Sequence, residues 1–193
     1  MRPLLALIPA LTVVLPFAAT AQAQGEEVVI GLVTLKDDPR YLQDWGYARL
    51  VVPPPVRSVD GAQMAVDDLA FVTEAMGLAP RIDERQATPE TALDAVPALV
   101  AAGANFVLLD LPGDLVETVS AAATDLDVTL INVSAPDNGL RTACRANLLH
   151  AYPSDRQMMD TFSQYLRAMD WTGLLILQGE NPRDAALADA FTE

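Results

Sequence analysis

The sequence predicts an α/β fold: a doubly wound parallel sheet, followed by the start of a second, incomplete α/β lobe. Two observations predict this fold. Short β-branched apolar runs, too short for helices and too apolar for edge strands, alternate along the chain with longer segments of helical periodicity. Parallel strands joined by helical crossovers form such a sheet, and its ligands bind beyond the carboxyl ends of the strands.

Residues 1–23 are expected to be a cleavable signal peptide. Arg2 precedes an almost wholly apolar run from Leu4 to Phe17, and small residues alternate before Ala23. The apolar run has about 14 residues, fewer than the ~20 that a membrane-spanning helix needs. We therefore expect cleavage after Ala23, with Ala21 as the alternative, and an exported protein.

The composition excludes several partners and sites. The chain has 12 Lys and Arg against 26 Asp and Glu, a net charge of -14, and its single lysine is Lys36. Without a basic stripe, binding to nucleic acid or to an anionic membrane surface is disfavoured. Cys144 is the only cysteine, so the sequence offers neither an internal disulfide nor a cysteine-rich metal site.

The first lobe is expected over residues 24–147. Its strands are expected at 28–35, 81–86, 105–111 and 128–133, and its helices at 60–76, 88–103 and 113–124. Asp60 is expected to cap the first helix and Gly77 to end it, while Pro97 should kink the second helix or shift its start. The long excursion between Lys36 and Asp60, with three aromatic residues, is typical of a functional loop.

An extended connector at 148–153 leads into residues 154–193, the expected start of a truncated second lobe. Ser154 and Gln157 form a capping box for a helix whose methionine-rich stripe is interpreted as core packing. A buried strand is expected at 173–178, and Asn181-Pro182 should open another helix. One strand with two helices cannot bury a sheet face, so either this tail docks on the first sheet or the sequence is a fragment of a two-lobed protein. We expect the fragment.

Polar residues that follow the predicted strands are the candidate site. Arg40 and Tyr41 follow the first strand, Gly113 and Asp114 a later one, and Ser134 and Asp137 the last, with Ser134 the best single candidate. Each has a structural alternative. Arg40 could bind a carboxylate of a ligand or pair with Asp37 or Asp38, Asp114 could be a helix cap, and Asp137 could belong to a turn.

The sequence shows no catalytic constellation, and no cofactor or metal ion is expected. His150 is the only histidine, and a glycine-rich phosphate loop is absent. A carboxylate-based hydrolase using Asp37, Asp38 or Asp110 has no catalytic partner placed by spacing. We therefore expect a binding protein rather than an enzyme.

Three segments carry a resemblance to a known family. The runs LKDDPRYLQDWGYARLVV (35–52), NFVLLDLPGD (105–114) and NVSAPDNGLRTACRANLLHAYPS (132–154) resemble type I periplasmic solute-binding proteins of ABC transporters. Within that family, which includes the branched-chain amino acid binders, they are similar to the branch associated with PQQ-dependent alcohol dehydrogenase systems. The most specific pieces are 38–41 and 144–147, and full members are about twice this length.

The resemblance implies a periplasmic receptor that closes two lobes around a small solute and presents it to a permease in the inner membrane, with residues 148–153 as one hinge strand. The ligand positions of the branched-chain binders match 111–114 and 134–137 here. Ser134 and Ala135 supply a hydroxyl and an amide, whereas Leu111-Pro112-Gly113 replaces the serine cluster. The alternative is a periplasmic accessory or sensor protein of a PQQ-dependent dehydrogenase system that contacts its components and delivers no solute.

Overall fold

The structure is a computed structural model that describes residues 25–41, 46–47, 50–51 and 56–192. The predicted signal peptide lies outside the described residues, as does Trp45 of the aromatic excursion. Within the excursion, Gly46–Tyr47 (β2) and Leu50–Val51 (β3) form a two-stranded antiparallel ribbon.

The centre of the molecule is a parallel sheet of five strands in the order β4-β1-β5-β6-β7. The strands are β1 (Glu26–Leu35), β4 (Leu78–Ala87), β5 (Ala104–Asp110), β6 (Thr129–Asn132) and β7 (Leu148–His150). The four strands predicted for the first lobe are confirmed. The fifth, β7, uses the first residues of the predicted connector and pairs with β6.

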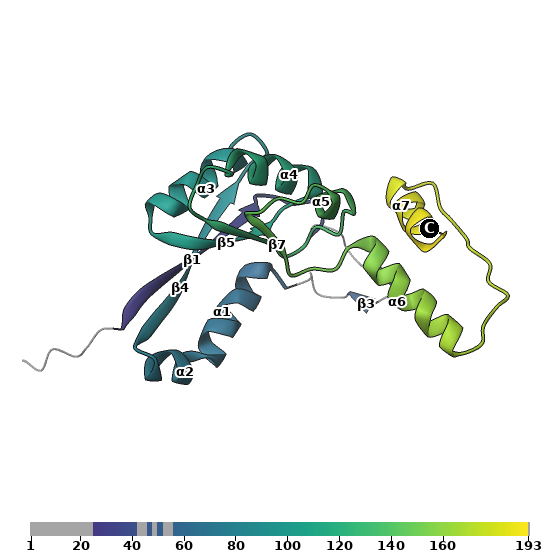
Figure 1. Cartoon of the computed structure of the whole chain (residues 1–193), viewed down its shortest axis with the longest axis horizontal. Helices are drawn as coiled ribbons and strands as arrows, with labels where there is room; N and C mark the ends of the chain where they lie inside the picture. Colours follow the sequence, from purple (N-terminus) through teal and green to yellow (C-terminus); the bar gives the residue numbers. More distant parts are fainter. Residues whose placement is uncertain (1–24, 42–45, 48–49, 52–55, 193) are drawn as a thin grey trace, which may run out of the picture.

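Helices lie on both faces of this sheet, as a doubly wound fold requires. On one face are α3 (Ala92–Ala101), α4 (Gly113–Ala122) and the short α5 (Gly139–Thr142). On the other are α1 (Ser58–Asp68) and α2 (Ala70–Ala75), next to β4 (Figure 1). The predicted fold class is confirmed.

The core lies between the sheet and α3 and α4. Its largest fully buried side chains include Val33, Leu99, Leu109 and Val116. Gly31 in β1 allows close approach: a Cβ there would lie 2.9 Å from Leu99 Cδ1. Because Gly31 has no side chain, α3 can pack closely on β1 at this point.

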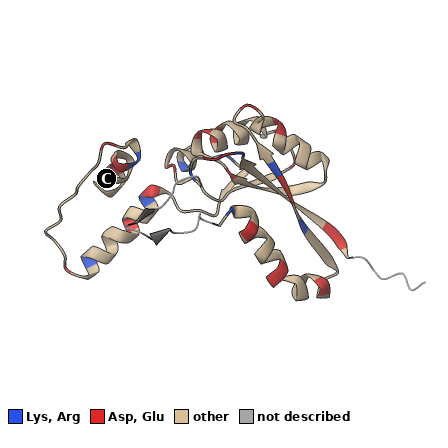
Figure 2. Cartoon of the chain, turned by 180° about the vertical axis from the view of Figure 1, so that it is seen from behind, with Lys and Arg blue, Asp and Glu red and all other residues tan. Residues whose placement is uncertain are grey.

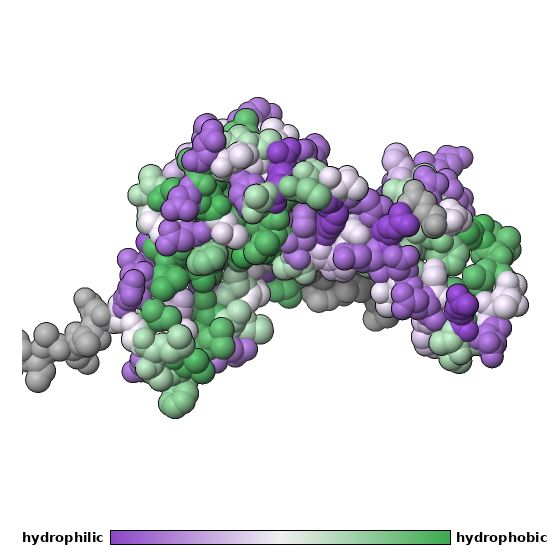
Figure 3. All heavy atoms as spheres, viewed as in Figure 1, coloured by the Kyte–Doolittle hydropathy of each residue, from purple (hydrophilic) through white to green (hydrophobic). Residues whose placement is uncertain are grey.

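The opposite face is less completely covered. No residue of α1 or α2 is buried, and an entirely apolar groove of about 440 Å³ runs between these helices and the sheet. Its lining includes Ile30, Val66, Leu69, Phe106 and Ile131. Apolar side chains gather there (Figure 3), while acidic residues mark the outer side of α1 and α2 (Figure 2).

Two predicted helix starts were wrong. The first helix begins at Ser58, and Asp60 lies in its first turn, where its Oδ2 accepts a hydrogen bond from Arg57 N (3.2 Å). The helix also divides at Leu69 into α1 and α2 before Gly77, whose φ of 69° ends the pair as predicted. In the second case Thr88 begins a turn closed by Thr91, and α3 starts after it.

The C-terminal part extends away from the sheet as α6 (Asp155–Ala168) and α7 (Pro182–Thr192) (Figure 1). The capping box of Ser154 and Gln157 is confirmed by hydrogen bonds of 2.8 and 3.2 Å. The two helices pack on each other through Phe162 and Phe191, whose ring centroids are 6.0 Å apart, and through an ion pair between Arg183 and Asp155.

The strand predicted at 173–178 was wrong. This segment pairs with no described strand, and Leu175 and Leu177 are 83% and 86% exposed. The stripe on α6 is also not core, because only Leu166 among its large apolar residues is buried. Within the described residues no helix is long and apolar enough to cross a bilayer.

Candidate functional site

A tight turn places Arg40 and Tyr41 at the carboxyl end of β1. Tyr41 N donates to Asp38 O (3.0 Å), with proline at the second position of the turn, where its fixed φ is favourable. The Asp38 carboxylate accepts from Arg40 N (2.9 Å) and from the guanidinium of Arg40 (2.6–3.1 Å). The side chain of Arg40 is therefore held in one direction, toward β5 and β6.

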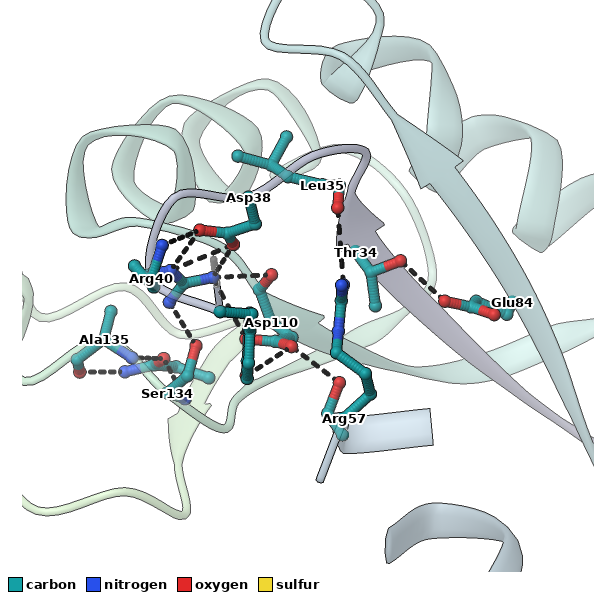
Figure 4. A network of polar contacts seen from close by, with 12 residues as sticks. Thr34, Leu35, Asp38, Arg40, Arg57, Glu84, Asp110, Ser134 and Ala135 are labelled. Atoms are coloured by element: carbon teal, nitrogen blue, oxygen red, sulfur yellow. Dashed lines mark hydrogen bonds and ion pairs between the residues drawn. The ribbon is translucent and has the colours of Figure 1, made fainter. Parts of the chain in front are cut away.

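Asp110, the last residue of β5, is the central acceptor of the site. It is fully buried, and its carboxylate accepts from Arg40 Nη2 (3.1 Å), Tyr41 Oη (2.9 Å) and Ser58 Oγ (2.6 Å). These donors come from the turn after β1 and from the start of α1 (Figure 4). A buried carboxylate needs such partners, so Asp110 holds the turn and α1 to the edge of the sheet.

Arg40 extends the network to the next strand. Its Nη1 donates to Ser134 Oγ (2.9 Å), two residues beyond β6. Burial disfavours the charged Arg40, but the hydrogen bonds to Asp38 and the charge of Asp110 outweigh it and raise the pKa of Arg40 above its usual value. Burial likewise opposes ionisation of Asp38, yet hydrogen bonds from Arg40 lower the pKa of Asp38. Both groups are charged at neutral pH.

Tyr41 lies between two cations. The guanidinium carbon of Arg57 is 4.4 Å from the centroid of the Tyr41 ring, and that of Arg40 is 5.7 Å away. Burial and the hydrogen bond to Asp110 raise the pKa of Tyr41 to about 12. The phenol therefore stays a neutral donor to Asp110 over the physiological range.

Replacing Tyr41 with phenylalanine should change alkaline unfolding. The raised pKa of Tyr41 gives stability that is fully present below pH 10.0 and is lost as pH rises through about 12. In the Tyr41→Phe variant the decline over this interval should be shallower, and a phenol that ionises late should disappear from the ultraviolet absorbance titration. Tyr152→Phe, which removes an exposed phenol, is the control, and an unchanged titration in Tyr41→Phe would contradict the assignment.

Asn132 shapes the loop that carries Ser134 and Ala135. It is fully buried at the end of β6, and its Oδ1 accepts from Ser134 N (3.2 Å) and Ala135 N (2.9 Å). Its Nδ2 donates to Ala135 O (2.7 Å) and lies 3.2 Å from His150 Nδ1. Burial and the charge of Arg141 lower the pKa of His150, so a neutral ring can accept this bond.

The remaining candidates form a second group beside α4. Gly113, Asp114 and Asp137 line a shallow depression of about 470 Å³. A Cβ on Gly113 would lie 2.3 Å from the Asp137 carboxylate, so the Asp137 side chain would have to move to admit a larger residue there. Asp114 lies in the first turn of α4 and does not cap it. Asp137 precedes α5, where its carbonyl accepts from Leu140 N (3.3 Å) and from Arg141.

The structure thus brings Arg40, Tyr41 and Ser134 together and leaves Gly113, Asp114 and Asp137 apart from them. Ala135 lies beside Ser134 but is buried, and its N–H is bonded to Asn132. The structural alternative for Arg40, a pair with Asp38, is realised. Sequence reasoning gave no site role to Arg57, Ser58 or Asn132, although each stands at the end of a predicted strand or just before a predicted helix.

Among the described residues, no group of three or more His, Cys, Asp or Glu could hold a metal ion. Cys144 is exposed with a free thiol, and its φ of 48° lies in the left-handed region. Neither observation indicates a redox-active or metal-binding group beside Asp110 among the described residues. The arrangement of donors around this carboxylate can hold and orient polar groups at the sheet edge.

Comparison with solved structures identifies the fold. An ABC transporter substrate-binding protein from Desulfitobacterium hafniense superposes with a TM-score of 0.62 at 16% sequence identity, covering 86% of this chain and 46% of its own. The chain has the fold of a type I periplasmic binding protein lobe. It spans about half the length of the solved binding proteins it matches.

Two further structures have the same periplasmic binding protein fold. A branched-chain amino acid transporter substrate-binding protein from Streptococcus pneumoniae, in complex with isoleucine, has a TM-score of 0.54 at 20% identity, over 73% of this chain and 38% of its own. A leucine-, isoleucine-, valine-, threonine- and alanine-binding protein from Brucella ovis has a TM-score of 0.57 at 15% identity, over 87% and 43%. No protein-family model matches the sequence, and no curated protein matches it.

Proposed function

We propose that this protein is the periplasmic substrate-binding component of an ABC transporter, which binds a small solute between two lobes and presents it to a permease in the inner membrane. One observation carries the proposal. The lobe has the fold of substrate-binding proteins, and side chains from three of its segments converge where ligands of parallel α/β sheets bind, beyond the carboxyl ends of β1, β5 and β6.

A link to PQQ-dependent alcohol oxidation is the finer part of this proposal. It is supported by the resemblance of three sequence segments to the binding proteins of those systems. One of the two most specific pieces of that resemblance, Asp38 to Tyr41, is also the turn that supplies Arg40 and Tyr41 to the polar network. Alcohols, aldehydes and the acids formed from them are therefore the first solutes to test.

The second lobe and its hinge belong to the same proposal. The connector at 148–153 begins in β7 and ends before the capped start of α6. Arg141 donates to Ala135 O (3.1 Å) and to the carbonyl of Tyr152, so one side chain joins the Ser134 loop to this connector. A hinge motion at this connector would therefore also move the Ser134 loop.

A thermal-stability screen of the full-length protein tests the function. Alcohols, aldehydes, short organic acids, amino acids and PQQ would each be added in excess. A receptor binds its solute only when folded, so one chemical class should raise the unfolding temperature by several degrees, in proportion to the logarithm of its concentration. Titration calorimetry would then give a saturable one-site isotherm for that class.

The screen can also reject the proposal. If no compound changes the unfolding temperature, and the protein is recovered from periplasmic extracts with a dehydrogenase, it is an accessory or sensor protein of that system. A bound solute without stimulation of its uptake in permease-containing vesicles would also reject the transport role.

A further inference from the structure

Arg57 is a cation of the site that forms no ion pair with any residue that the structure describes. It lies just before α1, and its Nη2 makes a long hydrogen bond of 3.4 Å to the carbonyl of Leu35, the last residue of β1 (Figure 4). Its Nε is buried and without a hydrogen-bond partner, and it forms no ion pair with any described residue. The charge of Arg57 helps to lower the pKa of Asp38, but no carboxylate of the described site is paired with it at contact distance.

Arg40, in the same site, is an arginine whose charge is paired with carboxylates. It pairs with Asp38 at 2.6 Å and with Asp110 at 3.1 Å, and its remaining nitrogen donates to Ser134. Each of its three guanidinium nitrogens donates to at least one protein acceptor. An incoming anion at Arg40 would have to displace one of these buried carboxylates, which is costly because the displaced charge would lose its partner.

Both buried carboxylates of the site already accept hydrogen bonds from protein donors. Asp38 accepts from Arg40, and Asp110 accepts from Arg40, Tyr41 and Ser58. Neither is left to receive an ammonium group of a solute. In the described part of the site both buried carboxylates are engaged, whereas the guanidinium of Arg57 has no ion-pair partner, which favours an anion over an amine.

We propose that Arg57 binds the anionic group of the solute, a carboxylate or similar oxyanion, so that the solute is an organic acid without a required ammonium group. The proposal rests on the proposed receptor function. Tyr41 holds the guanidinium by ring stacking, and the Leu35 carbonyl fixes one of its nitrogens, so the planar fork is oriented before the solute arrives. Arg57 is a specificity-determining residue of this site.

Paired solutes test the inference in the full-length protein. Short carboxylic acids would be compared with the alcohols and amides of the same carbon skeleton by titration calorimetry. The wild-type protein should bind an acid in preference to its uncharged counterpart. In Arg57→Met, affinity for the acid should fall by about 10- to 100-fold, the range expected for hydrogen bonds to a charged group. Arg57→Lys should restore part of the affinity, because the charge returns without the fork.

The control is Arg81→Met, which removes an exposed arginine of β4 that is paired with Glu27 of β1. It should leave acid binding unchanged. A purely structural role of Arg57 predicts that Arg57→Met weakens acids and uncharged solutes equally, and that result would overturn the inference. Preferred binding of alcohols or amides by the wild type would overturn it while leaving the receptor function standing. Absence of binding to every compound would instead reject the receptor function itself.

Discussion

Replacing Asp110 with alanine is expected to lower the free energy of unfolding by about 3–5 kcal/mol, the cost of breaking a buried ion pair from one side. The substitution removes the only described side chain that accepts from Arg40, Tyr41 and Ser58 together. Arg40 keeps Asp38, but the two hydroxyls lose their acceptor. Urea unfolding followed by circular dichroism would measure the loss.

Asp67→Ala is a suitable control, because Asp67 is exposed on α1 and accepts only from Gln63 in the described structure (2.9 Å). It should change stability by less than about 0.5 kcal/mol. Asp110→Asn would keep the shape but present an amide to three donors, so it should recover only part of the loss. Equal stability of Asp110→Ala and Asp67→Ala would show that the network contributes little to folding.

Asn132→Ala is expected to cost roughly 2–4 kcal/mol and to weaken solute binding. Each buried polar group left without a partner costs about 1–3 kcal/mol. The substitution removes the acceptor of Ser134 N and Ala135 N, whereas Ala135 O keeps a bond from Arg141. Freed from Asn132, the loop would no longer hold the Ser134 hydroxyl against Arg40, so unfolding and solute titrations should both respond.

Asn105→Ala provides the matched comparison, since Asn105 is exposed near the start of β5, at the opposite end of the sheet. It should leave both measurements close to wild type. If Asn132→Ala unfolds normally but binds solute weakly, its role is confined to orienting the loop. If both quantities are unchanged, the hydrogen bonds around Asn132 do not determine the conformation of the site.

The sheet could be predicted because its strands are short apolar runs that are buried on one or both faces. Leu32, Val33 and Leu109 are fully buried, as continuous β-branched and leucine-rich segments indicate. The polar strand β4 was harder to predict, since its burial is mostly partial and its place beside β1 comes from backbone pairing. The spacing of apolar residues along the sequence indicates which segments are buried. It indicates which segments pair as strands only when the paired strands are also buried.

The errors in the C-terminal part have one physical cause. The run at 173–178 has the composition of a buried strand, but a strand forms only when a neighbour accepts its hydrogen bonds. No described segment does so, and Leu175 and Leu177 are exposed. Local sequence can favour an extended conformation, but a strand forms only with a neighbouring strand, which the local sequence does not specify.

The candidate site was predictable in part. Arg40 and Asp38 are two residues apart, so their pairing could be expected from spacing alone. The bonds from Tyr41 and Ser58 to Asp110 span 69 and 52 residues and depend on how the strands are ordered in the sheet. Topology, rather than local chemistry, therefore selected Asp110 as the central acceptor and brought Arg57 to the edge of β1.

The parallel sheet also has a consequence for the order in which the chain can fold. Strand β1 meets its neighbours only over long distances along the sequence: Val29 pairs with Arg81 on one side and with Ala104 on the other. No hairpin can nucleate this sheet, so loop-closure entropy must be overcome before any strand is paired, and such chains fold slowly. Slow pairing leaves the apolar strand segments exposed to other chains for longer, so aggregation has to be avoided while the chain is still unfolded.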